Sequence, residues 1–317
     1  SDANGCTAGF STVIDQPNTP LGASINGISP ACRGDFNGSV ELDVFGGTPP
    51  YDFSWNGGVF LTEDLENVPA GSYSVVIRDD NGCSINRSIN LTDPPVLTSS
   101  ITSTNVTCFG ETDGTIDLTV NGGTVPYTYD WVNSNFDLSF STQDLNNVPA
   151  DQYSVEITDS RGCTNTNSVT ITEPSAPLGA TLSAQNVSCL GDTDGSASVA
   201  GIGGTPPYSY LWSGNQTTTN ISNLAAGQYF VTVTDDQNCT YLDSILIEEP
   251  AAPLSLSFTV TNVACAQGND GAIDLEVNGG TTPYQFNWNS GTFNTEDINN
   301  LFAGNYDVEV IDAKACV

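Results

Sequence analysis

The chain has 317 residues, of which 37 are acidic and 5 are basic, and its formal net charge is −32 without a single histidine. This acidity disfavours nucleic acid or an anionic membrane as a partner, because like charges repel. A hydrophobic content of 38% excludes a disordered tail. No apolar run approaches the roughly 18 residues that a membrane span needs, so we predict a folded chain without such a span.

One ten-residue block recurs four times and organises the sequence. It reads GGTPPYDFSW at 46–55, GGTVPYTYDW at 122–131, GGTPPYSYLW at 203–212 and GGTTPYQFNW at 279–288. The blocks begin 76, 81 and 76 residues apart, and a unit of that length can close its own hydrophobic core. We therefore expect tandem domains rather than solenoid turns. The predicted domains are 21–96, 97–177, 178–253 and 254–317, here called repeats 1 to 4; 1–20 is the expected end of a preceding repeat, and repeat 4 is expected to be truncated.

The elements within a repeat follow a fixed order. In repeat 1, apolar residues occupy every second position from Val40 to Val44, then from Tyr51 to Trp55, and again from Tyr73 to Ile77. Alternation with period two predicts strands with one buried face. Turns rich in Gly, Asn and Asp separate these strands, and proline-containing linkers follow the last one. This pattern predicts tandem immunoglobulin-like β-sandwich domains, all-β with six to seven strands each, forming an elongated rod.

Two aromatic positions recur in every repeat. A tryptophan closes the ten-residue block, and a tyrosine opens a later strand after a short corner. We predict that both belong to the core rather than to a sugar-binding surface, and that the tyrosine hydrogen-bonds back across its corner. The predicted core aromatic residues are Trp55, Trp131, Trp212, Trp288, Tyr73, Tyr153, Tyr229 and Tyr306. Only the interval between the two positions varies in length, which predicts a surface loop where any binding specificity would lie.

Nine cysteines alternate between short and long separations, so each repeat has an early and a late cysteine. The absence of C-x-x-C and of histidine disfavours zinc and thioredoxin-like chemistry and favours disulfides in an oxidising compartment. Two pairings fit the spacing. The favoured one is internal to each repeat and does not use Cys6, the late cysteine of the preceding repeat: Cys32–Cys83, Cys108–Cys163, Cys189–Cys239 and Cys265–Cys316. The other ties neighbours through Cys83–Cys108, Cys163–Cys189 and Cys239–Cys265.

A metal site and a catalytic site are both disfavoured by the sequence. Asp113, Asp194 and Asp270 precede a glycine shortly after the early cysteine and are minor calcium candidates. The matching late-turn residues are Asp79, Asp159, Asp235 and Asp312. Because the loops lack the dense D-x-D-x-D-G pattern, turn formation is the favoured interpretation and no cofactor is predicted. Catalysis is not predicted either, since the chain has no histidine and a single lysine to activate a nucleophile.

Repeat 3 contains NVSCLGDTDGS, then GGTPPYSYLW with the residues that follow it, and then ILIEEP. On these residues each repeat resembles the SprB repeat of Bacteroidota surface proteins. All four repeats match this pattern, although repeats 1 and 2 depart in the variable loop and repeat 4 has DAKAC where Asn-Gly-Cys is usual. The resemblance implies a long, repetitive cell-surface adhesin that is exported by the type IX secretion system and moved by the gliding machinery.

The sequence and the resemblance together predict a non-enzymatic shaft segment of an extracellular, outer-membrane-associated filament. Such a segment would support adhesion and gliding motility by displaying a distal adhesive tip and by transmitting force. The expected partners are neighbouring repeats, an external surface or polysaccharide through distal regions, and the gliding and secretion machinery through regions outside this chain. An array of polysaccharide-binding modules and a calcium-rigidified stalk are the alternatives.

Overall fold

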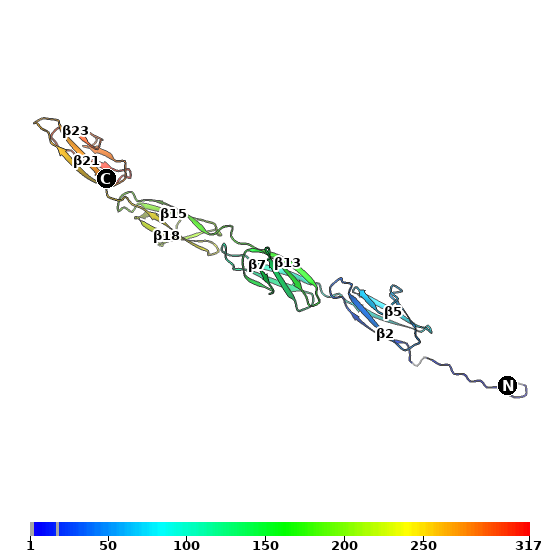
Figure 1. Cartoon of the computed structure of the whole chain (residues 1–317). Helices are drawn as coiled ribbons and strands as arrows, with labels where there is room; N and C mark the ends of the chain where they lie inside the picture. Colours follow the sequence, from blue (N-terminus) through cyan, green and yellow to red (C-terminus); the bar gives the residue numbers. More distant parts are fainter. Residues whose placement is uncertain (1–2, 17–18) are drawn as a thin grey trace. The chain divides into compact units, whose positions relative to one another are not determined.

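The computed structural model describes residues 3–16 and 19–317. The regular secondary structure of these residues consists of β-strands (Figure 1). Residues 1–2 and 17–18 of the predicted remnant 1–20 lie outside the described residues, and residues 3–16 contain no strand. The chain forms two compact units, one made of Ser1–Asn105 and Asp113–Ile171 and the other of Val106–Thr112 and Thr172–Val317. Each unit is described by itself, and the predicted repeats serve as names for its parts.

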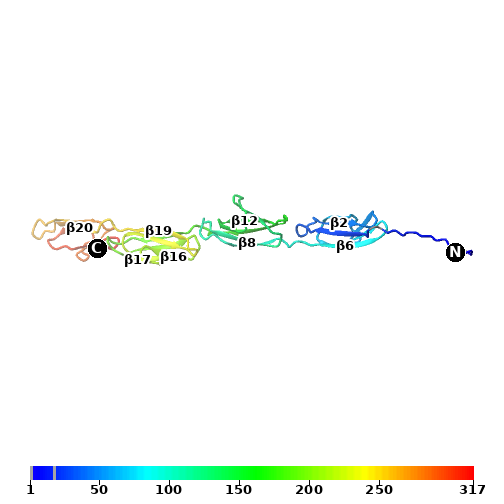
Figure 2. The ribbon, with the colours of Figure 1, turned by 90° about the horizontal axis from the view of Figure 1, so that it is seen from below.

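Repeat 1, in the first unit, is a sandwich of two antiparallel sheets. Its strands are β1 (Gly22–Ile28), β2 (Gly38–Phe45), β3 (Tyr51–Trp55), β4 (Leu65–Val68), β5 (Gly71–Asp79) and β6 (Ser84–Leu91). One sheet has the order β1-β2-β4 and the other β3-β5-β6; Figure 2 labels one strand of each, β2 and β6. In immunoglobulin nomenclature these sheets are ABE and CFG, a constant-type sandwich without strand D.

Repeat 2 completes the first unit and adds one short strand to the same plan. Its strands are β7 (Thr98–Thr104), β8 (Gly114–Asn121), β9 (Thr128–Asn133), β10 (Ser139–Phe140), β11 (Leu145–Val148), β12 (Asp151–Thr158) and β13 (Thr164–Ile171). The sheets are ordered β11-β8-β7 and β10-β9-β12-β13. The added strand β10 belongs to the longer variable loop, which folds back and pairs with β9.

Repeats 3 and 4 lie in the second unit. Repeat 3 has β14 (Gly179–Gln185), β15 (Gly195–Ile202), β16 (Ser209–Trp212), β17 (Asn220–Leu224), β18 (Gly227–Thr234) and β19 (Thr240–Ile247). Repeat 4 has β20 (Ser255–Thr261), β21 (Gly271–Asn278), β22 (Gln285–Trp288), β23 (Ile298–Leu301) and β24 (Val308–Ile311). Among the described residues, repeat 4 has no strand in the position of β19, so its second sheet consists of β22 and β24 alone. Repeat 4, which the sequence analysis gives as truncated, thus has five strands among the described residues, whereas repeats 1 to 3 have the predicted six or seven.

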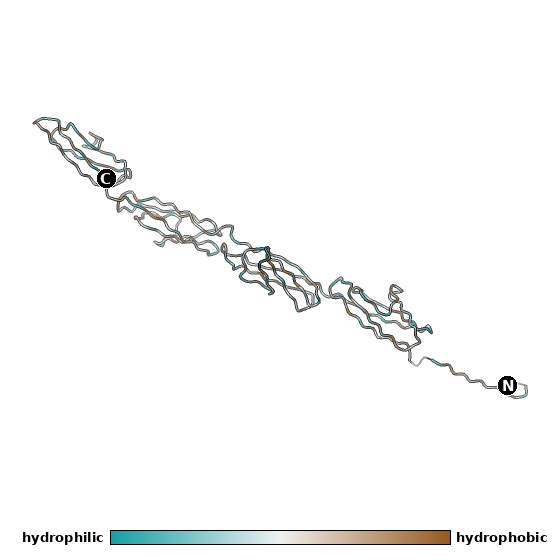
Figure 3. Tube along the Cα trace, in the orientation of Figure 1, coloured by the Kyte–Doolittle hydropathy of each residue, from teal (hydrophilic) through white to brown (hydrophobic). Residues whose placement is uncertain are grey.

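The core of each sandwich follows from the alternation in the sequence. In β2, Val40 and Leu42 are buried while Glu41 and Asp43 are exposed. The equivalent strands β8 and β15 also alternate between buried residues and exposed or half-buried ones. Figure 3 shows that hydrophilic and hydrophobic residues are mixed along the chain. Full burial of each such aliphatic side chain contributes roughly 1.5–3 kcal/mol. The described residues include no helix that is long and apolar enough to cross a membrane.

Candidate functional site

Each repeat has a proximal end, where the chain enters from the linker, and a distal end, where it leaves. In repeat 1 the proximal end holds the Gly46–Gly47 turn after β2, and the distal end holds the loop between β1 and β2. The Gly47 N–H donates to Thr19 O at 3.0 Å, so the turn is fastened to the incoming linker. A Cβ atom on Gly46, whose φ is +69°, would lie 2.1 Å from Pro20 O. Only glycine fits this turn.

The tyrosine of the ten-residue block closes the same turn. The Tyr51 hydroxyl donates to Gly46 O at 2.7 Å, and the equivalent bonds of the other repeats measure 2.5, 2.7 and 2.6 Å. In each block the peptide bond before the proline that precedes this tyrosine is cis: Pro49–Pro50, Val125–Pro126, Pro206–Pro207 and Thr282–Pro283. The tyrosine hydroxyl thus holds a turn that leads into a core strand.

A buried carboxylate ties this turn to the late hairpin of the same repeat. In repeat 2, Asp159 Oδ2 accepts the Thr124 N–H at 2.9 Å, and Oδ1 accepts the N–H groups of Arg161 and Cys163, each at 2.9 Å. Burial would raise the pKa of Asp159, but these N–H donors and the nearby Arg161 charge outweigh it and lower the pKa below the usual value. The equivalent buried residues are Asp79, Asp235 and Asp312. Both oxygens of the Asp159 carboxylate accept backbone N–H groups. The carboxylate therefore serves as a hydrogen-bond acceptor in the turn and not as a metal ligand.

Three disulfides connect successive repeats. They join Cys32 to Cys163, Cys108 to Cys239 and Cys189 to Cys316, with Cα–Cα distances of 5.6, 5.8 and 5.7 Å. The first lies in the first unit and the other two in the second, because the loop around Cys108 is part of the second unit. Every bond runs from the early cysteine of one repeat to the late cysteine of the next.

The pairing predicted within each repeat is wrong, and so is the alternative that ties each late cysteine to the next early one. Cys83 and Cys265, the predicted disulfide partners of Cys32 and Cys316, are exposed free thiols. Both pairings fail because the early and late cysteines of a repeat lie at opposite ends of the sandwich. Cys32 lies in the loop that precedes β2, whereas Cys83 lies in the β5–β6 turn, whose Asp79 accepts the Thr48 N–H just beyond the end of β2.

The length of β2 makes this separation decisive. Eight residues span about 25 Å at the usual rise of a strand, whereas a disulfide needs Cα atoms within about 7 Å. The distal cysteine of one repeat meets the proximal cysteine of the next instead, at the linker between them. Each bond closes a loop of 127 or 131 residues, for which the chain-entropy model gives roughly 4–5 kcal/mol.

The distal loop is also hydrogen-bonded to the outgoing linker. An N–H two residues after the early cysteine donates to the side chain of an acidic linker residue: Gly34 to Asp93 at 3.2 Å, Gly110 to Glu173 at 2.6 Å and Gly191 to Glu249 at 3.0 Å. Together with the disulfide, this hydrogen bond holds the linker between one repeat and the next. The sequence signal for it is an acid directly before the linker proline, and these acids are not among the predicted site residues.

The calcium candidates are turn residues in the structure. Asp194 accepts the Ser188 N–H at 2.9 Å and the Ser188 hydroxyl, which lower its pKa. Asp270 accepts the Ala264 N–H at 3.1 Å. The third candidate, Asp113, follows the early-cysteine loop of repeat 2. Within the residues that the structure describes, His, Cys, Asp and Glu form no group of three that could hold a metal ion.

The eight predicted core aromatic residues make two kinds of hydrogen bond, one through the tryptophan indole N–H and the other through the tyrosine hydroxyl. The tryptophans Trp55, Trp131, Trp212 and Trp288 are at most 2% exposed, and each indole N–H donates to a threonine carbonyl of the variable loop at 2.9–3.0 Å. The tyrosines hydrogen-bond back across their corners as predicted: Tyr73 to Pro69 O, Tyr153 to Pro149 O, Tyr229 to Ala225 O and Tyr306 to Phe302 O. Burial, together with the charges of Asp151 and Asp137, raises the pKa of Tyr153 to about 12.

The variable loop carries most of its apolar side chains on the outside. Val59 and Leu61 of repeat 1 are 68% and 71% exposed, and Phe136 of repeat 2 is 78% exposed. In repeat 2, Asp151 binds the loop through Asn133 and Ser134, and these hydrogen bonds lower its pKa. The loop therefore has a fixed base, set by the indole bond, and a variable exposed tip.

Two sheets of ABE and CFG order, a tyrosine corner and repetition along the chain define a tandem immunoglobulin-like β-sandwich protein. A family model described as the SprB repeat matches four stretches, 29–60, 100–136, 181–217 and 257–293. The chain therefore contains four SprB repeats. No curated protein sequence matches the chain.

Solved structures with tandem immunoglobulin-like domains are similar to the chain. Invasin, described as a bacterial integrin-binding protein, has 15% sequence identity and a TM-score of 0.33, over 93% of this chain and 77% of invasin. A Dscam structure has 14% identity and a TM-score of 0.25, over 93% and 97% of the two chains. Domains 3–5 of Drosophila OTK have 15% identity and a TM-score of 0.28, over 63% and 85%. These values describe similarity of fold alone.

The SprB repeats suggest a cell-surface adhesin, and with the disulfides they suggest a secreted or surface-exposed protein. Adhesin-like repeats with this fold are typically non-enzymatic.

Proposed function

We propose that the chain is a shaft segment of a bacterial cell-surface adhesin filament, one that holds a distal adhesive tip away from the cell and transmits pulling force during gliding. In this proposal residues 21–96, 97–177, 178–253 and 254–317 each fold as one domain, and export by the type IX secretion system delivers the filament to the outer membrane. The observation that supports it is that every disulfide passes from one repeat to the next.

The disulfides shorten the path along which tension travels. From Cys32 to Cys316 the backbone has 284 residue steps, but the covalent path through Cys32–Cys163 and Cys189–Cys316 uses only the 26 steps between Cys163 and Cys189. Fully extended, these paths measure on the order of 1000 Å and 100 Å. Of the strands, only β13 and β14 lie on the shorter path. Tension would therefore bypass the other strands of the sandwiches, and a shaft that must not lengthen under load gains from this bypass.

Single-molecule pulling of the four-repeat chain tests the proposal. We expect the oxidised chain to gain no more than about 100 Å between Cys32 and Cys316, whereas a variant with the six bonded cysteines changed to serine should lengthen by hundreds of ångströms as its repeats unfold. The matched control changes only the free thiols, Cys83→Ser with Cys265→Ser, and should behave like the original chain. Extension of the oxidised chain by several hundred ångströms at low force would refute a role in transmitting force.

A second candidate function is polysaccharide binding through the variable loops. It is supported by the exposed apolar tips, in particular Phe136, because exposed aromatic rings can stack on sugars. A glycan array probed with the four-repeat chain and with Phe136→Ser distinguishes the two functions. Absence of signal from the original chain would remove this candidate, and binding that survives Phe136→Ser would place the site elsewhere.

A further inference from the structure

Repeat 3 has an apolar patch on the outer face of its β16-β18-β19 sheet, the face that points away from the core. Side chains at every second position of these strands form this face, because Trp212, Val231 and Val233 at the positions between them are buried. Four of the outward side chains are large, apolar and exposed: Leu211 by 52%, Phe230 by 44%, Leu242 by 65% and Leu246 by 56%. We call these four residues the outer patch. Its phenylalanine lies on the central strand, and its leucines lie on the two flanking strands.

Repeats 1 and 2 have polar residues at the same four positions. The strand register identifies the equivalents, because Trp55 faces Val75 in repeat 1 as Trp212 faces Val231 in repeat 3. The residues that correspond to Leu211, Phe230, Leu242 and Leu246 are Ser54, Ser74, Asn86 and Asn90 in repeat 1 and Asp130, Ser154, Thr166 and Thr170 in repeat 2. The sandwich therefore forms without the patch, which is a property of repeat 3.

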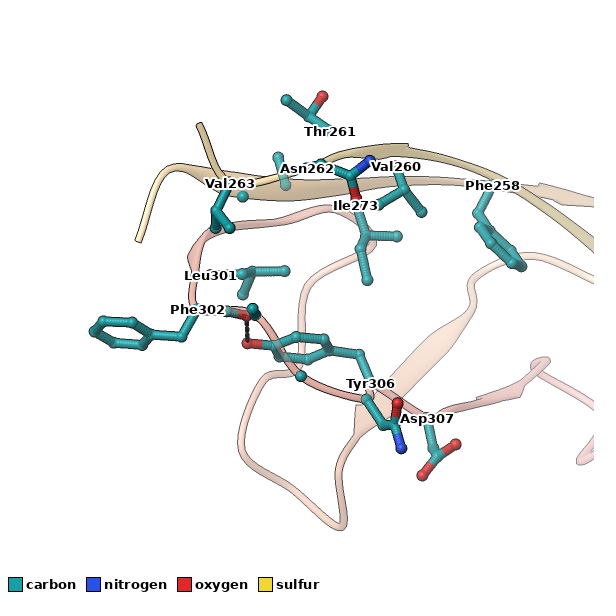
Figure 4. A pocket seen from close by; sticks show the side chains of 15 residues that line it. Phe258, Val260, Thr261, Asn262, Val263, Ile273, Leu301, Phe302, Tyr306 and Asp307 are labelled. Carbon is teal, nitrogen blue, oxygen red and sulfur yellow. Dashed lines mark hydrogen bonds between the residues drawn. The ribbon is translucent and has the colours of Figure 1, made fainter. Parts of the chain in front are cut away.

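Repeat 4 exposes apolar side chains in a different place, on the inner faces of its sheets. Phe258 and Val260 lie around a pocket between the sheets, together with Tyr306 (Figure 4). On the outer face of its β22-β24 sheet, the positions that match the first two residues of the outer patch hold Asn287 and Asp307. Among the described residues, repeat 3 alone has large apolar side chains at these outward positions.

The outer face of this sheet in repeat 3 is uncharged, although the formal net charge of the chain is −32. Its outward positions hold Ser209, Leu211, Gln228, Phe230, Thr232, Thr234, Thr240, Leu242, Ser244 and Leu246. The same face carries two charged residues in each of the first two repeats: Asp52 and Arg78, then Asp130 and Glu156. Two acidic chains repel each other, and the repulsion is smallest where two uncharged faces meet. A cationic partner would instead bind the acidic residues elsewhere, so the charge distribution favours a second copy of the chain at this face.

The shape of the face also fits a copy of itself. Thr232 on β18 lies between Leu211 and Leu242 on the flanking strands. Phe230 lies beside Ser244 on β19. Large and small side chains therefore alternate across the face, and two sheets that pack face to face interdigitate such side chains at a separation of about 10 Å.

We propose that two copies of the chain associate face to face through the outer patch of repeat 3. The dimer is isologous, and the two-fold axis packs Phe230 of each copy over Ser244 of the other. With eight residues in β18, three strands cover roughly 27 Å by 14 Å, so the pair buries on the order of 800 Å². Stable complexes usually bury at least about 1,200 Å², so this dimer is weak and reversible. It joins two copies side by side whether or not the chain is a shaft segment.

Sedimentation velocity over a concentration series up to about 1 mM tests the dimer, because weak interfaces dissociate at lower concentrations. Iodoacetamide first blocks the exposed thiols, so that no disulfide forms between copies; these are Cys6, Cys83 and Cys265. We expect a monomer–dimer equilibrium. Phe230→Ser should weaken it at least about 10-fold, since this residue is the central aromatic side chain of the patch. The fold should persist, because serine occupies the equivalent positions 74 and 154.

The matched control is Ile202→Ser. Ile202 is 51% exposed and ends β15, in the other sheet of the same repeat, so its replacement should leave association unchanged. Two outcomes would overturn the proposal. One is a chain that stays monomeric at every concentration, and the other is Phe230→Ser associating as well as Ile202→Ser.

Photo-cross-linking measures the geometry of the dimer separately. With p-benzoylphenylalanine in place of Phe230, irradiation should produce covalent dimers. Peptide mapping should find the cross-links mainly in residues 227–234 and 240–247 of the other copy, because the proposed axis places β18 and β19 opposite this side chain. Cross-links that fall mainly in β14, β15 or β17 would contradict a face-to-face dimer of this sheet.

Discussion

Repeats 3 and 4 have the same proximal end but differ in their distal halves. Both have the glycine turn, the buried aspartate and the buried tryptophan, and Val233 and its equivalent Val310 are 0% and 2% exposed. On the distal side, β18 has eight residues and β24 has four, and among the described residues no strand pairs with residues 304–307. The two repeats therefore share their proximal contacts and differ in the length of this strand.

The largest difference between the two repeats should appear when the Cys189–Cys316 bond is removed. With both residues changed to serine, we expect a loss of roughly 4–5 kcal/mol, because the chain-entropy constraint disappears. Each repeat has one tryptophan, so variants that keep only Trp212 or only Trp288 report separately on repeats 3 and 4 in urea. Repeat 4 should show the larger shift, since among the described residues its second sheet has two strands and that of repeat 3 has three. Cys83→Ser with Cys265→Ser is the control and should leave both midpoints unchanged.

A change at the proximal end should affect the two repeats equally. A Cβ at Gly204 would lie 2.5 Å from Asp235 Oδ2, and one at Gly280 would lie 2.9 Å from Asp312 Oδ2, both at positive φ. We expect Gly204→Ala and Gly280→Ala each to cost at least about 2 kcal/mol. Gly191→Ala is the control, because its φ is also positive but nothing lies within 4 Å of the new atom, so it should cost about 1 kcal/mol. If the losses of unfolding free energy caused by Gly204→Ala and Gly280→Ala differ widely, the proximal ends of the two repeats are not equivalent.

Acid should weaken repeat 4 through its buried aspartate. Burial would raise the pKa of Asp312, but the N–H groups of Cys316, Thr281 and Lys314, with the Lys314 charge, lower it below the 3.8 of an unperturbed aspartate. A lowered pKa in the folded state stabilises the fold above pH 3.8, and this contribution is lost as the pH falls through the folded-state pKa. Urea midpoints reported by Trp288 should fall between pH 5 and pH 2, and less so in Asp312→Asn. If the urea midpoint of Asp312→Asn falls as much between pH 5 and pH 2 as that of the original chain, the Asp312 carboxylate does not cause the loss of stability in acid.

The smallest effect is expected at the tyrosine corners. The hydroxyls of Tyr229 and Tyr306 each donate one bond of 3.0 Å to a backbone carbonyl. Tyr229→Phe and Tyr306→Phe should each lower the free energy of unfolding by about 1 kcal/mol, since one hydrogen bond is lost. The exposed Tyr241 supplies the control, and Tyr241→Phe should change stability by less than about 0.5 kcal/mol. A Tyr306→Phe change with no effect on the free energy of unfolding would contradict a stabilising contribution from this hydrogen bond.

The sequence predicts those parts of the fold that depend on local chemistry. The alternation around Val40 and the position of Tyr73 predict a buried strand and a tyrosine corner, because period and turn residues act over a few positions. The disulfides depend on which end of a sandwich a loop occupies, and spacing alone does not carry that information. Asp79 shows the same limit, since an acid four residues before Cys83 was considered as a calcium ligand but accepts backbone N–H groups.

The three disulfide loops overlap along the chain. Cys32–Cys163, Cys108–Cys239 and Cys189–Cys316 together span every peptide bond from residue 32 to residue 316. A protease that cuts once anywhere in this range therefore leaves both fragments covalently attached, provided that the disulfides stay oxidised. A protein built on this plan outside the cell would survive single cleavages of its exposed loops without losing whatever is attached at its far end.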